Sequence, residues 1–203
     1  MVKNAVSHKP GDIINLAGIE FGVLDVREPV CSDDPGALFI MAINTQGEDC
    51  RFGDTNDYTK SDLRVAVDEW LEELGESGVN LDLIEPREID LTTLDGRANY
   101  GKLEVKAAPL TLDEARMYAK FIPNSNDWSW LATGWGAPGM NGSTFAFRVN
   151  SNGDWRDDYC SGSYGIRPAL VISSSLLTSE REPDLSDVPT DVLLGELRRR
   201  IEE

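Results

Sequence analysis

The stretch that decides the fold is residues 128–169, which read WSWLATGWGAPGMNGSTFAFRVNSNGDWRDDYCSGSYGIRPA. It begins with the strand-like motif Trp-Ser-Trp-Leu and ends with Gly-Ile-Arg-Pro. Between these motifs, aromatic residues alternate with glycine and short polar residues more densely than anywhere else in the chain. Such mixtures form adaptable binding surfaces, because aromatic rings supply contact area at a low cost in conformational entropy. We therefore expect this stretch to bind a partner on a framework supplied by the upstream residues.

Within the stretch, Asn152 and Gly153 predict a β-hairpin turn. A tight two-residue turn would place Arg148 opposite Asp157, and would point Arg156, Asp158 and Cys160 inward together with the apolar residues of the preceding strand. A wider loop would instead place Val149 opposite Trp155 and send Trp155 to the core. The sequence leaves both registers open.

Composition restricts the class of protein. The 203 residues are 40% hydrophobic and 27% charged, as expected for one globular domain with a core. Nineteen basic against 36 acidic residues give a net charge of -17, which disfavours nucleic acids and anionic membranes as partners. No run has the length of a membrane span, and the first residues lack the apolar region of a secretory signal. We expect synthesis in the cytoplasm, without membrane insertion.

The sequence offers little for catalysis. Cys31, Cys50 and Cys160 are an odd number at wide spacings, so they form neither a zinc motif nor a disulfide framework. A reducing compartment is the simpler inference, with a bridge between Cys31 and Cys50 as the open alternative. His8 is the single histidine, which leaves no evident partner for a nucleophile and too few ligands for a metal. We predict no catalytic residues, no metal site and no cofactor.

Two helices are predicted among short strands. Ser61 is a natural N-cap, apolar residues follow it at three- and four-residue spacing, and Gly75 is the expected C-cap. Thr111 and Glu114 form a capping box for a second helix, which Pro123 should end. Apolar-rich runs over residues 12–26, 37–43 and 169–172 predict strands. The expected fold class is α+β.

The last 25 residues differ in character. We expect one domain over residues 1–178, followed by a charged linker and a short amphipathic helix over residues 179–203. Residues 190–203 carry leucines on one side. They offer a means of self-association or of docking on a larger assembly, and a frayed end is the alternative.

Several motifs occur together in order: NDYTKSDLR at 56–64, DLTTLDG at 90–96, PLTLDE at 109–114, WSWLAT at 128–133 and GIRPAL at 165–170. In this order and spacing, over residues 10–175, the chain resembles the C-type-lectin-like variable proteins of diversity-generating retroelements, which are microbial and phage ligand-binding proteins. The resemblance implies two helices packed on small antiparallel sheets. It also implies a non-enzymatic protein that binds a protein or cell-surface ligand, in some cases as part of a phage virion.

In the diversified members of that family, adenines of asparagine-type codons are rewritten. Every residue of 156–164 is reachable in this way, whereas the tryptophans and Met140 are not and should be scaffold or fixed contacts. Trp128 and Trp130 are expected in the core, and Arg167 is expected to be structural. The predicted ligand-binding residues are Trp135, Asn141, Arg148, Arg156, Asp157, Asp158, Tyr159, Ser161, Ser163 and Tyr164.

Two other functions are weighed against ligand binding. A structural phage tail component without a variable ligand would dock through the C-terminal helix. An oxidoreductase of the formylglycine-generating type shares the lectin-like architecture, but its chemistry requires closely placed cysteines and copper. Cys160 stands alone in its region of the sequence, which disfavours this reading.

Overall fold

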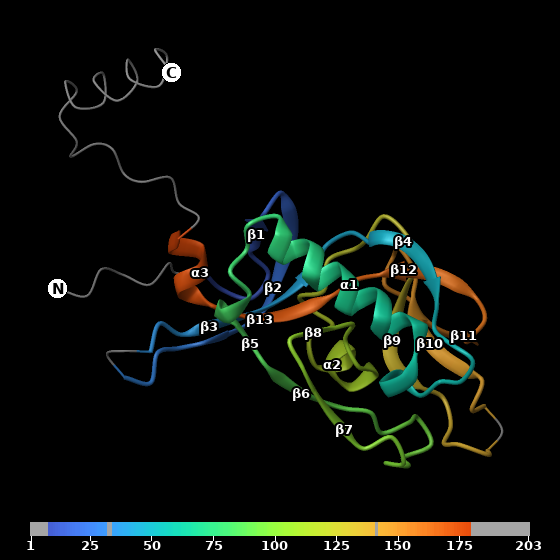
Figure 1. Ribbon diagram of the computed structural model, residues 1–203. Coiled ribbons are helices and arrows are strands. Elements are labelled where there is room, and N and C mark those ends of the chain that lie inside the picture. Colours follow the sequence, from blue (N-terminus) through green and yellow to red (C-terminus); the bar gives the residue numbers. More distant parts are fainter. Residues whose placement is uncertain (1–7, 32–33, 141, 180–203) are drawn as a thin grey trace, which may run out of the picture.

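In the computed structural model, which describes residues 8–31, 34–140 and 142–179, apolar runs from both ends of the domain meet in one six-stranded sheet (Figure 1). Its strands, in spatial order, are β1 (Ile13–Leu16), β2 (Ile19–Arg27), β3 (Ala37–Ala42), β13 (Ala169–Ser173) and β5 (Ile84–Glu85), with β8 (Ala107–Ala108) also paired to β13. The antiparallel ladder between β3 and β13 joins residues about 130 positions apart, so the sheet is completed by long-range contacts.

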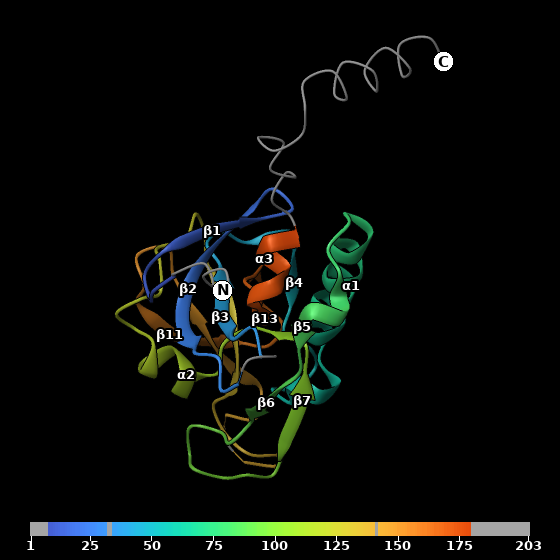
Figure 2. The same ribbon diagram turned by 90° about the vertical axis from the view of Figure 1, so that its left-hand side faces the viewer.

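The two predicted helices cover opposite faces of this sheet (Figure 2). Helix α1 (Asp62–Glu76) packs Leu63, Val67 and Trp70 against one buried cluster, which includes Ile40 of β3. Helix α2 (Leu112–Met117) packs against the next residue of the strand, Met41, in a second cluster. Successive strand residues point to opposite faces, so β3 is buried on both sides and its sequence is apolar throughout.

The start of α1 is confirmed, but its predicted end is wrong. The Ser61 hydroxyl accepts a hydrogen bond from the Arg64 backbone N–H at 3.0 Å, as an N-cap does. The helix passes through Gly75 and ends at Glu76, with Ser77 as the C-cap. A Cβ at Gly75 would lie 2.9 Å from Cδ1 of Leu81. Glycine is therefore explained here by the close approach of Leu81, not by helix termination.

Helix α2 has the predicted capping box, since the Thr111 hydroxyl accepts from Glu114 N–H and the Glu114 carboxylate accepts from Thr111 N–H. It ends at Met117, six residues before the expected Pro123. Tight turns replace its last part, with Phe121 N–H donating to the Tyr118 carbonyl. These turns direct Phe121 against the second buried cluster, so tertiary packing overrides the helical pattern.

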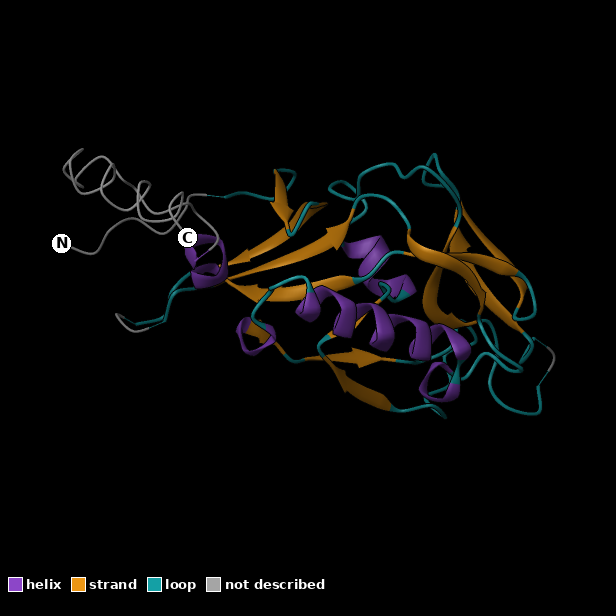
Figure 3. Cartoon of the chain, turned by 45° about the horizontal axis from the view of Figure 1, so that its top comes forward, coloured by secondary structure: helices purple, strands orange, loops and turns teal. Residues whose placement is uncertain are grey.

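A second sheet of five strands carries the stretch 128–169 (Figure 3). Its strands, in order, are β11 (Trp155–Tyr159), β10 (Phe145–Val149), β9 (Ser129–Gly134), β12 (Ser163–Ile166) and β4 (Gln46–Arg51), and β6 (Arg87–Asp90) with β7 (Lys102–Val105) forms a separate ribbon. The expectation of purely antiparallel sheets is wrong at one pairing. Gly165 of β12 lies parallel to Ser129 of β9, where the chain crosses from one side of β9 to the other.

Further short helices complete the described part of the chain. Two are 3-10 helices, η1 (Tyr58–Lys60) and η2 (Leu81–Leu83). The third α-helix, α3 (Ser174–Ser179), follows β13 directly and is not among the helices that the sequence predicts. Leu176 explains the difference, because its buried side chain joins the first cluster. The predicted linker and C-terminal helix, over residues 180–203, lie outside the described residues.

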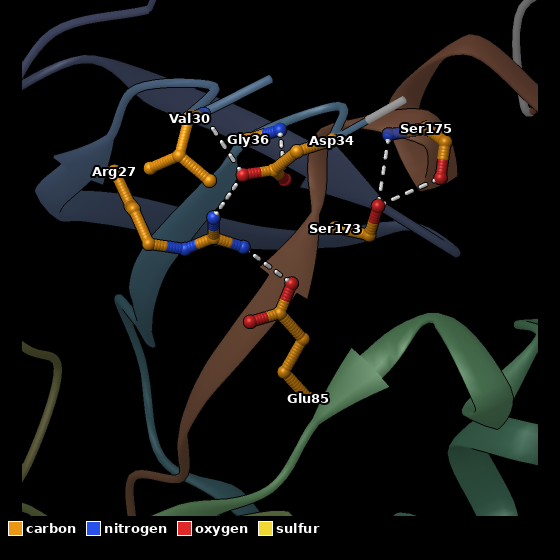
Figure 4. Close-up of polar contacts among 7 residues, drawn as sticks. All are labelled: Arg27, Val30, Asp34, Gly36, Glu85, Ser173 and Ser175. Atoms are coloured by element: carbon orange, nitrogen blue, oxygen red, sulfur yellow. Dashed lines mark hydrogen bonds and ion pairs between the residues drawn. The ribbon is translucent and has the colours of Figure 1, made fainter. Parts of the chain in front are cut away.

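Ion pairs link β2, the loop after it and β5 of the large sheet (Figure 4). Arg27 pairs with Asp34 (Nη1–Oδ2, 2.6 Å) and with Glu85 of β5 (Nη2–Oε1, 2.8 Å). Asp34 also accepts the backbone N–H groups of Val30 and Gly36. Because Arg27 is partly exposed, these pairs fix the loop after β2 more than they stabilise the fold.

Within the described residues, no helix combines the length and the hydropathy needed to cross a bilayer.

Candidate ligand-binding surface

The β10–β11 hairpin has the wider of the two registers considered. Val149 lies opposite Trp155, and Phe145 lies opposite Tyr159. Asn150 closes the five-residue loop, because its side-chain oxygen accepts the backbone N–H groups of Asn152 (3.1 Å) and Asp154 (2.8 Å). The tight two-residue turn is therefore wrong.

Trp155 does not enter the core as that register predicted, since 36% of its surface stays exposed. Strand β11 is the edge strand, with β10 as its one neighbour in the sheet. Side chains of β11 are therefore covered on one side only, whereas Phe147 and Val149 of β10 are buried. Trp155 instead forms part of the wall of a cavity beside the hairpin.

The centre of the surface is Arg148. Its guanidinium carbon lies 3.6 Å from the ring centroid of Trp128 and 4.5 Å from that of Tyr164. Nε and Nη2 donate to Oδ2 of Asp158 at 3.0 and 2.9 Å. The Tyr164 hydroxyl donates to the same carboxylate oxygen at 2.6 Å. Two aromatic rings, a cation and an anion thus form one cluster, which we call the Arg148 cluster.

Strand pairing brings this cluster together. Arg148 of β10 lies opposite Trp130 of β9, and the neighbouring pair places Asp158 opposite Ala146. The buried Trp130 supports the cluster from below, because the Tyr164 ring meets it edge to face at 4.9 Å. The Trp130 indole N–H donates to the Cys50 carbonyl at 2.9 Å, which anchors the cluster to β4.

The cluster carries fixed charges at neutral pH. Burial opposes ionisation of Asp158, but hydrogen bonds from the Tyr164 hydroxyl and the Tyr159 N–H, together with Arg148, outweigh it and lower the pKa of Asp158. Burial, and then the hydrogen bond to Asp158, raises the pKa of the Tyr164 hydroxyl. Asp158 is therefore an anion and Tyr164 a neutral donor.

The aromatic residues Tyr159 and Trp135 are more open. Tyr159 is 59% exposed, and its ring packs on Phe145 at a centroid distance of 4.2 Å. Trp135, 38% exposed, lies in the loop after β9. A Cβ at Gly142 would lie 2.1 Å from Cε3 of Trp135, so the backbone passes directly over the indole. Each ring is packed against a neighbouring residue on one side and is open to solvent on the other.

The structure sorts the predicted ligand-binding residues into two groups. Arg148, Asp158 and Tyr164 are half-buried and bound to one another. Those that are exposed are Trp135, Arg156, Asp157, Tyr159, Ser161 and Ser163. Cys160, within the stretch expected to vary, is 2% exposed and packs in the first cluster. Asn141 lies outside the described residues.

Trp128 corrects the expectation that it belongs to the core. It is half-buried, and its ring forms one side of the Arg148 cluster. Sequence reasoning left it out of the binding residues because Trp-Ser-Trp-Leu reads as a strand start. The Trp128 ring stacks on Arg148, a residue of the neighbouring strand β10, and nothing local in the sequence signals this contact.

Asn56 is a second residue that the sequence did not single out. Its side chain is 1% exposed and donates to the carbonyls of Gly136 (3.0 Å), Gly142 (3.1 Å) and Phe145 (2.9 Å). Its oxygen accepts from the Tyr100 hydroxyl at 2.6 Å. One buried amide therefore holds the loop that carries Trp135.

The thiols of Cys50 and Cys160 are neutral in the folded protein. The structure leaves Cys31, Cys50 and Cys160 unpaired, so the alternative bridge from Cys31 to Cys50 is absent. Burial raises the pKa of Cys50 to about 11 and that of Cys160 to about 12. Both are protonated at neutral pH, whereas a nucleophilic cysteine is a thiolate.

Comparisons add no family to this description. No protein-family model matches the chain, no curated protein matches its sequence, and no solved structure matches it.

Asn56→Ala should lower the free energy of unfolding by about 2–3 kcal/mol, because buried carbonyls and the Tyr100 hydroxyl would lose their partner. Urea unfolding measures this. Asn99→Ala is the matched control, because Asn99 is exposed, and it should change stability by less than about 0.5 kcal/mol. Similar losses in the two variants would contradict the role assigned to Asn56.

Asp158→Asn should give a pH-dependent loss of stability. The pKa of Asp158 is lowered in the folded state, so its contribution is present above the unfolded pKa and is lost as pH falls through the folded value. The difference in Tm from wild type should be large at about pH 7 and small at about pH 3. Asp157→Asn, at an exposed neighbour, is the control. A Tm difference for Asp158→Asn that stayed constant with pH would rule this out.

Proposed function

We propose that this protein is a non-enzymatic ligand-binding protein with a C-type-lectin-like fold, of the kind diversified by retroelements. Its ligand is a protein or a cell-surface molecule, and its binding surface is formed by β10, β11, β12 and the loop after β9. The observation that carries the proposal is the Arg148 cluster. It is a preorganised set of aromatic and charged groups, with exposed residues around it that form few contacts of their own.

Preorganisation supports binding more than it supports folding. Arg148 and Tyr164 are held by Asp158 in conformations that a partner would otherwise have to fix, which lowers the entropic cost of association. Arginine, tyrosine and tryptophan are also the residues most enriched in interface hot spots. A half-buried cluster of all three on one sheet is consistent with an interface centre.

The division between fixed and open positions also supports diversification. Arg156, Asp157, Tyr159, Ser161 and Ser163 are exposed, so replacing them removes little buried surface. The tryptophans, which adenine rewriting cannot produce, include the buried Trp130 and the stacked Trp128. Variation at these five positions would therefore fall on the surface, whereas Asp158, Cys160 and Tyr164 of the same stretch belong to its support.

The motifs behind the resemblance meet in space. Asn56 of the first motif and Tyr100, four residues after the second, share a hydrogen bond of 2.6 Å beneath the loop after β9. Gly165 of the motif GIRPAL lies so close to Thr45 that a Cβ on this glycine would be 2.3 Å from Cγ2 of Thr45. Both contacts support the candidate surface from residues outside it.

A display library tests the binding surface without knowledge of the natural ligand. Randomising Arg156, Asp157, Tyr159, Ser161 and Ser163 together should yield folded variants that bind lysozyme, because these side chains are exposed on a rigid support. Selection on yeast, with unfolding midpoints of single clones, measures both properties.

The control library varies five exposed residues of α1, which are Val65, Asp68, Glu69, Glu72 and Glu76. It should retain folding and yield far fewer binders. Equal yields from the two libraries would count against the assigned surface.

Diversification has its own test in the gene. We expect a near-identical repeat of the DNA encoding residues 156–164, differing at adenine positions, beside a gene for a reverse transcriptase. Sequencing the locus in several isolates measures both features. An invariant segment with no such repeat would contradict diversification and favour a fixed ligand.

A further inference from the structure

Arg167 is a buried cation without a counter-ion. Its side chain is 1% exposed, yet no carboxylate of the described residues lies within ion-pair distance. Arg87 and Arg148, the other largely buried arginines of the described chain, pair with Glu114 and Asp158. Burial alone lowers the pKa of the Arg167 guanidinium to about 10, and no neighbouring anion offsets it. An unpaired charge in this setting costs stability and commonly marks a functional site.

Part of the guanidinium has a structural task. Nε donates to the Ala42 carbonyl at 3.1 Å, and Nη2 donates to the Pro123 carbonyl at 2.9 Å. These bonds tie the end of β3 to the turns after α2. Nη1 has no hydrogen-bond partner among the described residues, although a guanidinium has five N–H donors to satisfy.

The same side chain lines a cavity of about 210 Å³ between α2 and the five-stranded sheet. Its inner walls are the buried apolar side chains of Met41, Leu110, Leu131 and Val149. The hairpin loop and Trp155 form another side, on the opposite face of β10 from Arg148. The cavity is thus separate from the Arg148 cluster.

These two observations define the chemistry of a ligand. Arg167 is the single charged residue of the lining, so the polar end of the ligand should be a single anion. Asn124 and Asn152 are the neutral polar side chains of the lining, and the buried apolar walls favour a hydrocarbon body. With Arg167 as the one cation of the lining, a singly charged carboxylate fits better than a phosphate, which would need several charged donors. Pockets for drug-sized ligands measure about 300–1,000 Å³, so this one suits a smaller molecule.

We propose that this cavity binds a small apolar carboxylic acid, whose carboxylate pairs with Arg167 and whose hydrocarbon body fills the space beside Trp155. The site is independent of the proposed binding surface. A guanidinium presents a planar fork of donors that matches a carboxylate, so the ligand supplies the anion that the fold lacks. Binding also fixes Trp155 and the hairpin loop from behind.

Phenylacetate and its neutral amide, phenylacetamide, are the probes, titrated into the full chain by calorimetry. Phenylacetate should bind with a Kd on the order of 1 mM or tighter and raise the Tm. Phenylacetamide should bind at least about tenfold more weakly, because it cannot form the charged pair. No saturable phenylacetate binding, or equal binding of the two probes, would overturn the proposal.

Substitution of Arg167 itself would strip the Ala42 and Pro123 carbonyls of their donor, so a blocking variant is the sharper test. Ala119→Phe places a ring at an exposed position of the cavity rim. It should fold normally and lose phenylacetate binding. Met117→Phe is the matched control, since Met117 is exposed and outside the lining, and it should bind as wild type does. Unchanged binding by folded Ala119→Phe would refute the site.

Discussion

The buried amide of Asn56 is the interaction on which the candidate surface depends. It joins the carbonyls of Gly136, Gly142 and Phe145 to the Tyr100 hydroxyl, and the Asn56 side chain is 1% exposed. Gly134 is required beside it, since a Cβ there would lie 2.6 Å from Cγ of Asn56. Ordering a loop rich in glycine costs conformational entropy, and the hydrogen bonds of this side chain offset part of that cost. Trp135 is placed as a result.

The candidate surface contains residues that hold one another in place and exposed residues that could be replaced at little cost in stability. Arg148, Asp158 and Tyr164 satisfy one another, so they hold their conformations without a ligand. The exposed residues of β11 lie on an edge strand and Ser161 lies in the turn before β12, where side chains contribute little to the core. Replacing these exposed residues should therefore change the free energy of folding little.

Buried arginines show how the same residue type takes different tasks. Arg148 is neutralised by a carboxylate and stacked between rings, which makes it part of a surface. Arg167 is enclosed and bound to two carbonyls, so its charge remains available to an anion that reaches the cavity. The sequence prediction that Arg167 is structural accounts for its hydrogen bonds to the two carbonyls. It does not address the proposed binding of an anion in the cavity.

Local sequence determined the elements that depend on neighbouring residues. The caps at Ser61 and Thr111, the apolar stripe of α1 and the apolar strand β3 follow from spacing, because capping and periodic burial are short-range effects. The α+β class follows from them. Tertiary structure alone decided the rest: the hairpin register, the early end of α2, the helix α3, the burial of Cys160 and the turning of Trp128 toward Arg148. Each of these depends on contacts between residues far apart in the chain, whose free energy no local pattern encodes.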